Sequence, residues 1–115
     1  MHYTRIFSDT TGESHFETVI VPLKDNGAVG YLSECFEVKS LQFRENKASY
    51  KWDFHNAPFK QFIILLDGEI EITTSTGETR QFTSGDILLV EDTTGKGHMT
   101  KNIKKQIRNS IFVQL

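Results

Sequence analysis

Short runs of alternating apolar and polar residues extend over most of the chain from residue 17 onward. Alternation sends successive side chains to opposite faces of a strand and is typical of β-strands with one face buried. No segment has the period of an amphipathic helix, and turn residues separate the runs. The pattern therefore predicts an all-β domain, a barrel or a sandwich. Its strands are expected at 17–23, 33–43, 49–55, 61–66, 69–75, 79–82, 87–90 and 107–115.

The run 61–66 is apolar on both faces, as expected of a strand that is covered on both sides. Asp67-Gly68 then forms a turn signal typical of hairpins. In the following strand, Ile70 and Ile72 alternate with polar residues and are predicted to point inward.

The run 49–55 has two unlike faces, because Tyr50, Trp52 and Phe54 alternate with polar residues. The polar set either faces water or points into a pocket, with the aromatic side chains packed against a neighbouring sheet or subunit. On the second interpretation, the side chains that enter the pocket from this strand are Lys51, Asp53 and His55.

Two further segments give weaker patterns. Residues 1–15 are polar without a stable period, so we expect a loosely held N-terminal arm. Cys35 lies inside an alternating run, and a buried, unreactive position is the expected role for it.

Composition limits the size and class of the protein. A chain of 115 residues with 37% hydrophobic content is enough for one core, so residues 1–115 are expected to form a single domain. The net charge is −2 and the charges are dispersed, which argues against a nucleic-acid partner. The most basic run contains Lys101, Lys104, Lys105 and Arg108, and we interpret it as a solvated strand end.

The single cysteine excludes an internal disulfide and suits a reducing compartment. No charged and apolar signal segment opens the chain, and no apolar run approaches the roughly 18 residues that a membrane-spanning helix needs. We therefore expect a cytoplasmic protein with no membrane partner.

Two segments carry spacings that resemble a known family. The first is His55-Asn56-Ala57, three residues, Gln61, six residues and Gly68. The second is Thr93-Thr94-Gly95, two residues, His98, three residues and Asn102. Both resemble the two motifs of the cupin superfamily, and in particular its small, single-domain RmlC-like members. The resemblance implies a jelly-roll β-barrel and a homodimer.

Cupins commonly bind one divalent metal through three histidines and a glutamate. The resemblance keeps His55 and His98 as ligands, places Ala57 at the other histidine position, and offers only the neutral amide of Gln61 in place of the glutamate. Without a carboxylate, such a site is predicted to bind Zn, Ni, Fe or Mn weakly or not at all. Gln61 is alternatively expected to hydrogen-bond a histidine ring and fix its tautomer.

The Gly95-Lys96-Gly97 run does not fit a phosphate-binding loop, and we interpret it as a turn that delivers His98 to the pocket. His55 and His98 should then converge in one pocket with Lys51, Asp53 and Gln61.

Three functions remain open for this predicted pocket. The first is binding of a small polar or anionic molecule. The second is a metal-dependent enzyme of the dioxygenase kind. The third is a metal-free isomerase or epimerase with His55 or His98 as general base.

Overall fold

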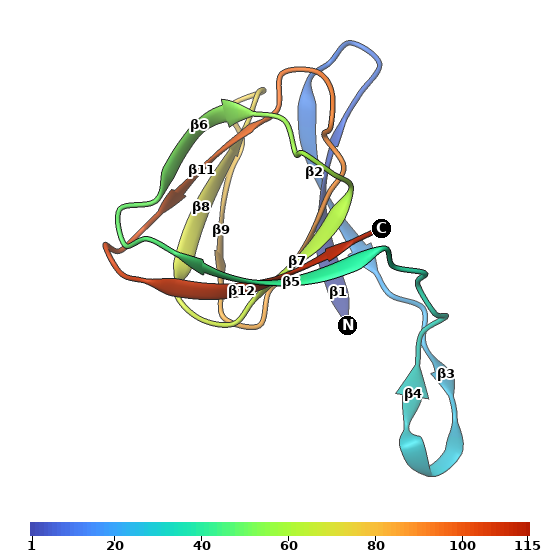
Figure 1. Cartoon of the computed structure of the whole chain (residues 1–115). Coiled ribbons are helices and arrows are strands. Elements are labelled where there is room, and N and C mark those ends of the chain that lie inside the picture. Colours follow the sequence, from blue (N-terminus) through green and yellow to red (C-terminus); the bar gives the residue numbers. More distant parts are fainter.

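Two β-sheets face each other in the computed structural model, which describes all 115 residues (Figure 1). The larger sheet contains six strands: β1 (His2–Ser8), β2 (Ser14–Ile20), β5 (Ser40–Asn46), β7 (Gln61–Leu65), β10 (Ile87–Val90) and β12 (Arg108–Gln114). They lie in the order β2-β1-β10-β7-β12-β5.

The smaller sheet contains four strands: β6 (Lys51–His55), β8 (Glu69–Thr74), β9 (Thr79–Thr83) and β11 (His98–Asn102). Their order is β6-β11-β8-β9. The only helical segment is a 3₁₀ turn, η1 (Gly27–Val29), so the all-β prediction is confirmed. The two sheets share no strand and do not close into one continuous barrel. No helix is long and apolar enough to cross a lipid bilayer.

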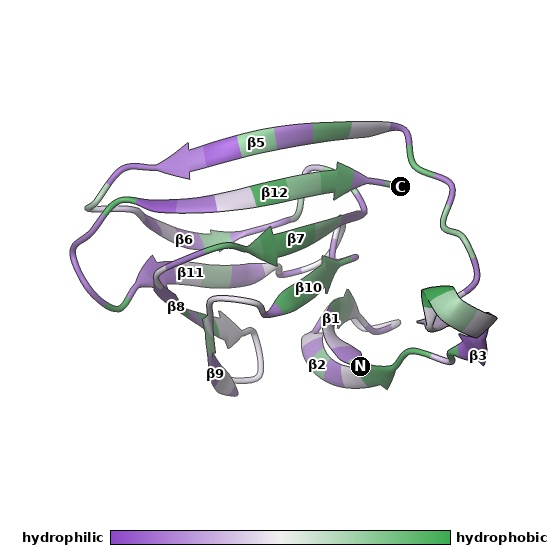
Figure 2. Cartoon of the chain, turned by 90° about the horizontal axis from the view of Figure 1, so that it is seen from below, coloured by the Kyte–Doolittle hydropathy of each residue, from purple (hydrophilic) through white to green (hydrophobic).

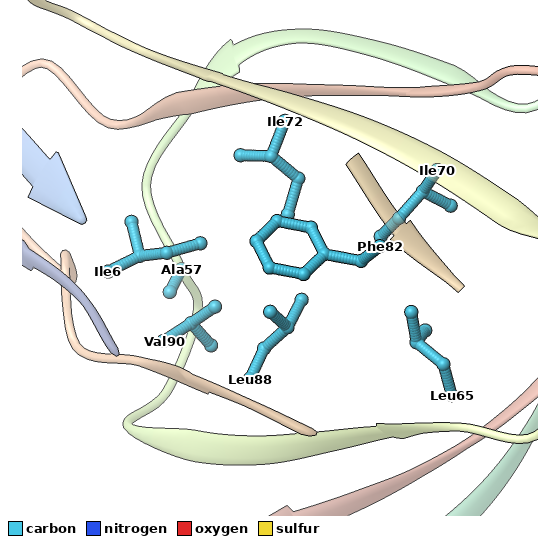
Figure 3. Close-up of a cluster of buried hydrophobic side chains, with 8 residues drawn as sticks. All are labelled: Ile6, Ala57, Leu65, Ile70, Ile72, Phe82, Leu88 and Val90. Atoms are coloured by element: carbon cyan, nitrogen blue, oxygen red, sulfur yellow. The ribbon is translucent and has the colours of Figure 1, made fainter. Parts of the chain in front are cut away.

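The hydrophobic core lies between the two sheets and draws side chains from both (Figure 3). Ile70 and Ile72 are 3% and 2% exposed, as their alternation predicted. The larger sheet contributes Leu88 and Val90 from its apolar strand β10. The other members of the cluster are Ile6, Ala57, Leu65 and Phe82.

The N-terminal segment is not a loose arm. Strand β1 pairs in parallel with β10 and antiparallel with β2, and Ile6 is fully buried. The prediction failed because only Thr4 and Ile6 carry the inward face of β1, so its hydrophobic pattern is short and partly polar.

Residues 33–43 also differ from the prediction, because strand β5 begins only at Ser40. Cys35 is exposed rather than buried. Before it, a small hairpin formed by β3 (Lys24–Asp25) and β4 (Tyr31–Leu32) stands away from the two sheets (Figure 1, and from below in Figure 2). The alternation in this region is real, but its apolar side is only partly covered, because Phe36 packs edge-on against Phe62 and still remains half exposed, as does Val38.

The buried position of Ile6 gives a direct test of β1. We expect Ile6→Ala to lower the free energy of unfolding by about 2 to 5 kcal/mol in urea titrations, since it leaves a cavity in the core. The matched control is Ile20→Ala, whose side chain is 70% exposed. A loose N-terminal arm would instead keep both changes within about 0.5 kcal/mol.

Candidate functional site

A cavity of about 200 Å³ lies between the two sheets. Most of its wall is apolar, and a small number of polar groups project into it, an arrangement typical of small-molecule sites. Its lining residues are Arg44, Tyr50, Trp52, His55, Ala57, Pro58, Gln61, Ile63, Leu65, Ile70, Ile72, Leu88, Val90, His98, Thr100, Arg108 and Phe112.

The two predicted histidines meet at this cavity. His55 is the last residue of β6 and lies directly opposite His98, the first residue of β11. Their ring centroids are 4.6 Å apart, with the ring planes inclined at 56°. The predicted convergence of His55 and His98 is therefore confirmed.

A β-bulge determines which residues of β6 share the cavity. His98 is opposite His55 but Thr100 is opposite Trp52, so two steps along β11 match three steps along β6. The extra residue brings Trp52 and His55 to the same side, although simple alternation would separate them. Their rings stack with centroids 3.7 Å apart and planes 6° from parallel.

The bulge also explains an error in the predicted pocket. Tyr50 and Trp52 line the cavity together with His55, whereas Lys51 and Asp53 do not. Strict alternation had placed the charged residues of β6 inside and the aromatic ones outside. Trp52 forms part of the cavity wall, although its side chain is half exposed.

Gly97 allows the turn before β11 to pass against the backbone of His55. Its φ is +72°, and a Cβ atom at this position would lie 2.0 Å from the His55 carbonyl oxygen. Only glycine fits such an approach. The buried hydroxyl of Ser14 donates a hydrogen bond to the Gly97 carbonyl at 2.7 Å and holds the turn from the other side. The turn thus delivers His98 to the cavity, as the sequence predicted.

His98 is held by a buried carboxylate. Asp92 is fully buried, and its Oδ2 lies 2.5 Å from His98 Nδ1. The other carboxylate oxygen, Oδ1, has no hydrogen-bond partner. A carboxylate accepts the Nδ1 proton, which leaves Nε2 as the ring nitrogen available to a ligand. Asp92 was missed as a site residue because the sequence does not show that its strand end lies behind His98.

His55 has the same tautomer for a different reason. Its Nδ1 donates to the Asp53 carbonyl oxygen at 2.8 Å, so Nε2 again remains free of protein partners. Burial lowers the pKa of His55, and the neighbouring His98 ring contributes in the same direction. The folded protein therefore favours the neutral form of His55.

Gln61 lines the cavity and is 5% exposed. No hydrogen bond joins its side chain to either histidine, so the alternative role predicted for it is not observed. Its amide is a neutral group in a cavity that otherwise presents imidazole and guanidinium groups as its main polar contacts.

Arg44 and Arg108 are cavity residues that the sequence did not reveal. Arg108 is 2% exposed and is not part of a solvated strand end. Its Nε donates to Asn102 Oδ1 at 2.8 Å. Alternation along β12 could have revealed it, since Arg108 and Phe112 lie on one face of this strand and Ile111 lies on the other. The lysines just before Arg108 led us to interpret the whole run as solvated.

The residues present fit a divalent metal poorly. No group of three His, Cys, Asp or Glu side chains is placed to hold an ion. Two imidazoles and the Gln61 amide supply no negative charge, and Arg44 and Arg108 add positive charge to the same cavity. A cation bound by these donors would therefore have no carboxylate ligand to offset its charge.

Comparisons with known proteins add little at this point. No protein-family model matches the chain, and no curated protein matches it. Among solved structures, protein NMB1881 from Neisseria meningitidis is similar over 69% of this chain and 80% of that chain, with a TM-score of 0.48 and 13% identity. A likeness of this size carries no argument about function.

The approach of Gly97 to His55 predicts a large difference between two glycine substitutions. Gly77 also has a positive φ, but nothing lies within 4 Å of a Cβ at that position. We expect Gly77→Ala to cost about 1 to 2 kcal/mol of stability from backbone strain alone. Gly97→Ala should cost at least about 3 kcal/mol, because it adds a clash with backbone. Equal losses in urea unfolding would show that the two strands are not in this close contact.

The pKa of His55 predicts a pH effect on stability. Because this pKa is lowered in the folded state, the unfolded chain binds more protons below about pH 6.5, the ordinary histidine value. The contribution of His55 to the stability of the folded protein is complete above that pH, and it is lost as the pH falls through the pKa of the folded state. We expect acidification from about pH 7.5 to 5.5 to destabilise the parent protein more than His55→Gln. Parallel pH curves for the two proteins would contradict this.

Proposed function

We propose that the chain is a small cupin-like jelly-roll domain whose cavity binds a small polar or anionic molecule. The observation that carries this proposal is the pair of histidines with fixed tautomers, His55 and His98, which present their Nε2 atoms at one cavity. The facing sheets and the cupin-like spacing of the two histidines support the fold part of the proposal.

The mixture of apolar and polar side chains in the cavity wall favours binding of an organic molecule. Apolar side chains from β7, β8 and β10 can cover its body, while the histidines and Gln61 supply the hydrogen bonds that orient it. Trp52 closes one side of the site and holds the His55 ring in place by stacking.

Trp52 also provides the test, because it is the only tryptophan of the chain. A fragment screen that follows its emission should find small molecules that bind in the cavity. Ala57→Leu, which places extra side-chain volume in the cavity wall, should abolish the response. The exposed Ala28→Leu should not, and circular dichroism checks that both variants fold. Fragments that bind Ala57→Leu as well as the parent would place the binding elsewhere.

A second function is favoured by the Asp92 and His98 pair. A buried carboxylate on Nδ1 stabilises a ring that takes up a proton at Nε2, so His98 is suited to act as a general base in a metal-free isomerase or epimerase. For any ligand with an acidic C–H bond, the parent protein should then exchange that hydrogen with deuterium from solvent. Asp92→Asn should keep binding and lose exchange, and exchange at the parental rate in this variant would exclude the role.

The metal-dependent alternative is the least supported, since the donor set lacks a carboxylate. We propose that His55, Gln61 and His98 bind Zn, Ni, Fe or Mn weakly at best. Elemental analysis of protein purified without a chelator or an affinity tag tests this. One retained equivalent of metal after dialysis would restore the metalloenzyme hypothesis.

We further propose that the chain forms a homodimer. Strand β5 is an edge strand, and an unusual amount of apolar surface is exposed on it and on the segment before it. The exposed residues include Val29, Tyr31, Phe36, Val38, Leu41 and Phe43. Sedimentation should give a dimer for the parent and a monomer for Phe43→Asp. The control Phe59→Asp, outside this segment, should remain dimeric, and a monomeric parent would refute the proposal.

A further inference from the structure

Two arginine side chains enter the cavity from neighbouring strands of the larger sheet. Arg44 comes from β5 and Arg108 from the paired strand β12. Tyr50 lies beside both, with its ring centroid 4.7 Å from Arg44 Cζ and 5.5 Å from Arg108 Cζ. One end of the cavity is therefore strongly positive.

No carboxylate forms an ion pair with either arginine, and Asp67 acts on Arg108 only through a longer-range attraction. Neither Arg44 nor Arg108 takes part in an ion pair, whereas Arg5 pairs with Glu17 and Glu91 and Arg80 pairs with Glu78. A buried cation without a partner is costly, and buried charges in proteins are normally paired. Burial and the neighbouring charge of Arg44 lower the pKa of Arg108, yet a guanidinium stays protonated at neutral pH.

Neutral oxygens of two asparagines hold the guanidiniums in place. Asn102 accepts from Arg108 Nε through its side-chain oxygen and donates to the Ala48 carbonyl at 3.1 Å, which ties it to the loop before β6. With its amide oxygen turned toward the arginines, Asn46 accepts from Arg44 at 2.9 Å and from Arg108 at 3.2 Å. These contacts fix the side chains without cancelling their charge, which leaves donors for a ligand.

Gly68 contributes to the same arrangement. A Cβ at Gly68 would lie 2.7 Å from Arg108 Cβ, so the absence of a side chain leaves room for the buried stem of Arg108. The aliphatic part of Arg108 therefore packs against Gly68, while the two asparagines hold its guanidinium group.

We propose that Arg44 and Arg108 form an anion-binding subsite for the carboxylate or phosphate group of an amphipathic organic ligand. This inference rests on the proposed function, because it names the ligand class that the cavity takes. Guanidinium groups match both oxyanions through paired hydrogen bonds, and the apolar wall next to them suits a hydrocarbon or aromatic body.

The histidines lie toward the other end of β11, the strand whose last residue holds Arg108. Arg108 is attached to Asn102 at the end of β11, whereas His98 begins that strand. At about 3.3 Å per residue, the two ends are roughly 13 Å apart. The anionic group would therefore anchor one end of the ligand and direct its other end toward His55 and His98.

The test compares a charged probe with a neutral probe of the same shape, and adds a second oxyanion, at constant ionic strength. The probes are 3-phenylpropionate, its neutral amide 3-phenylpropanamide, and phenyl phosphate, and their binding is followed by Trp52 emission and by thermal shift. The variants are Arg44→Met and Arg108→Met, with Arg80→Met as a control outside the cavity. Two separate variants cover the case in which one of them does not fold.

We expect at least one anionic probe to bind the parent and Arg80→Met about tenfold more tightly than the amide, as a charge-assisted contact should give. The preference should disappear in Arg44→Met or Arg108→Met. Comparison of 3-phenylpropionate with phenyl phosphate tells which oxyanion the subsite prefers.

Equal binding of the amide and both anions, unchanged in the arginine variants, would refute the anion subsite and leave the small-molecule cavity standing. Absence of any response to all three probes would count against the subsite and the proposed cavity function together.

Discussion

The β-bulge between β6 and β11 is the feature on which the site depends. Without the extra residue in β6, Trp52 and His55 would lie on opposite faces of the sheet. The bulge brings them together, and the stacked indole then leaves the His55 ring little freedom. The close passage of Gly97 against His55 brings the start of β11 to the same place, so that His98 meets His55.

The cavity has an unequal distribution of charge along its length. One end carries Arg44 and Arg108, neither of which forms an ion pair with a carboxylate. The other carries two imidazoles whose Nδ1 atoms are already engaged by Asp92 and by the Asp53 carbonyl. An organic anion suits this distribution better than a metal cation, since its charged group would be attracted to the arginines while the free Nε2 atoms remain to contact its other end.

Sequence patterns predicted the strands of the core well, because hydrophobic alternation there is strong. Strand β10 (Ile87–Val90) has the predicted bounds, and Ile70 and Ile72 point inward as expected. The prediction from motif spacing that His55 and His98 converge was also correct. These features depend on local periodicity or on motif spacing, which the chain displays directly.

The remaining site residues depend on contacts that periodicity does not encode. Because of a single extra residue in β6, Tyr50 and Trp52 line the cavity, whereas simple alternation had predicted Lys51 and Asp53. Arg108 follows a run of exposed lysines and was predicted to be exposed like them. Asp92 comes after the end of a strand, and its position behind His98 is set by tertiary packing. Strand β1 was missed because its buried face consists of one threonine and one isoleucine.

Nitrogen NMR of the imidazole rings reports whether both histidines present Nε2 to the cavity. Spectra of ¹⁵N-labelled protein, taken at a pH high enough for the rings to be neutral, separate the two tautomers of each ring. The structure predicts that His55 and His98 both carry their proton on Nδ1, and that Asp92→Asn disturbs His98 but leaves the tautomer of His55 unchanged. A proton on Nε2 of either ring in the parent protein would contradict the account.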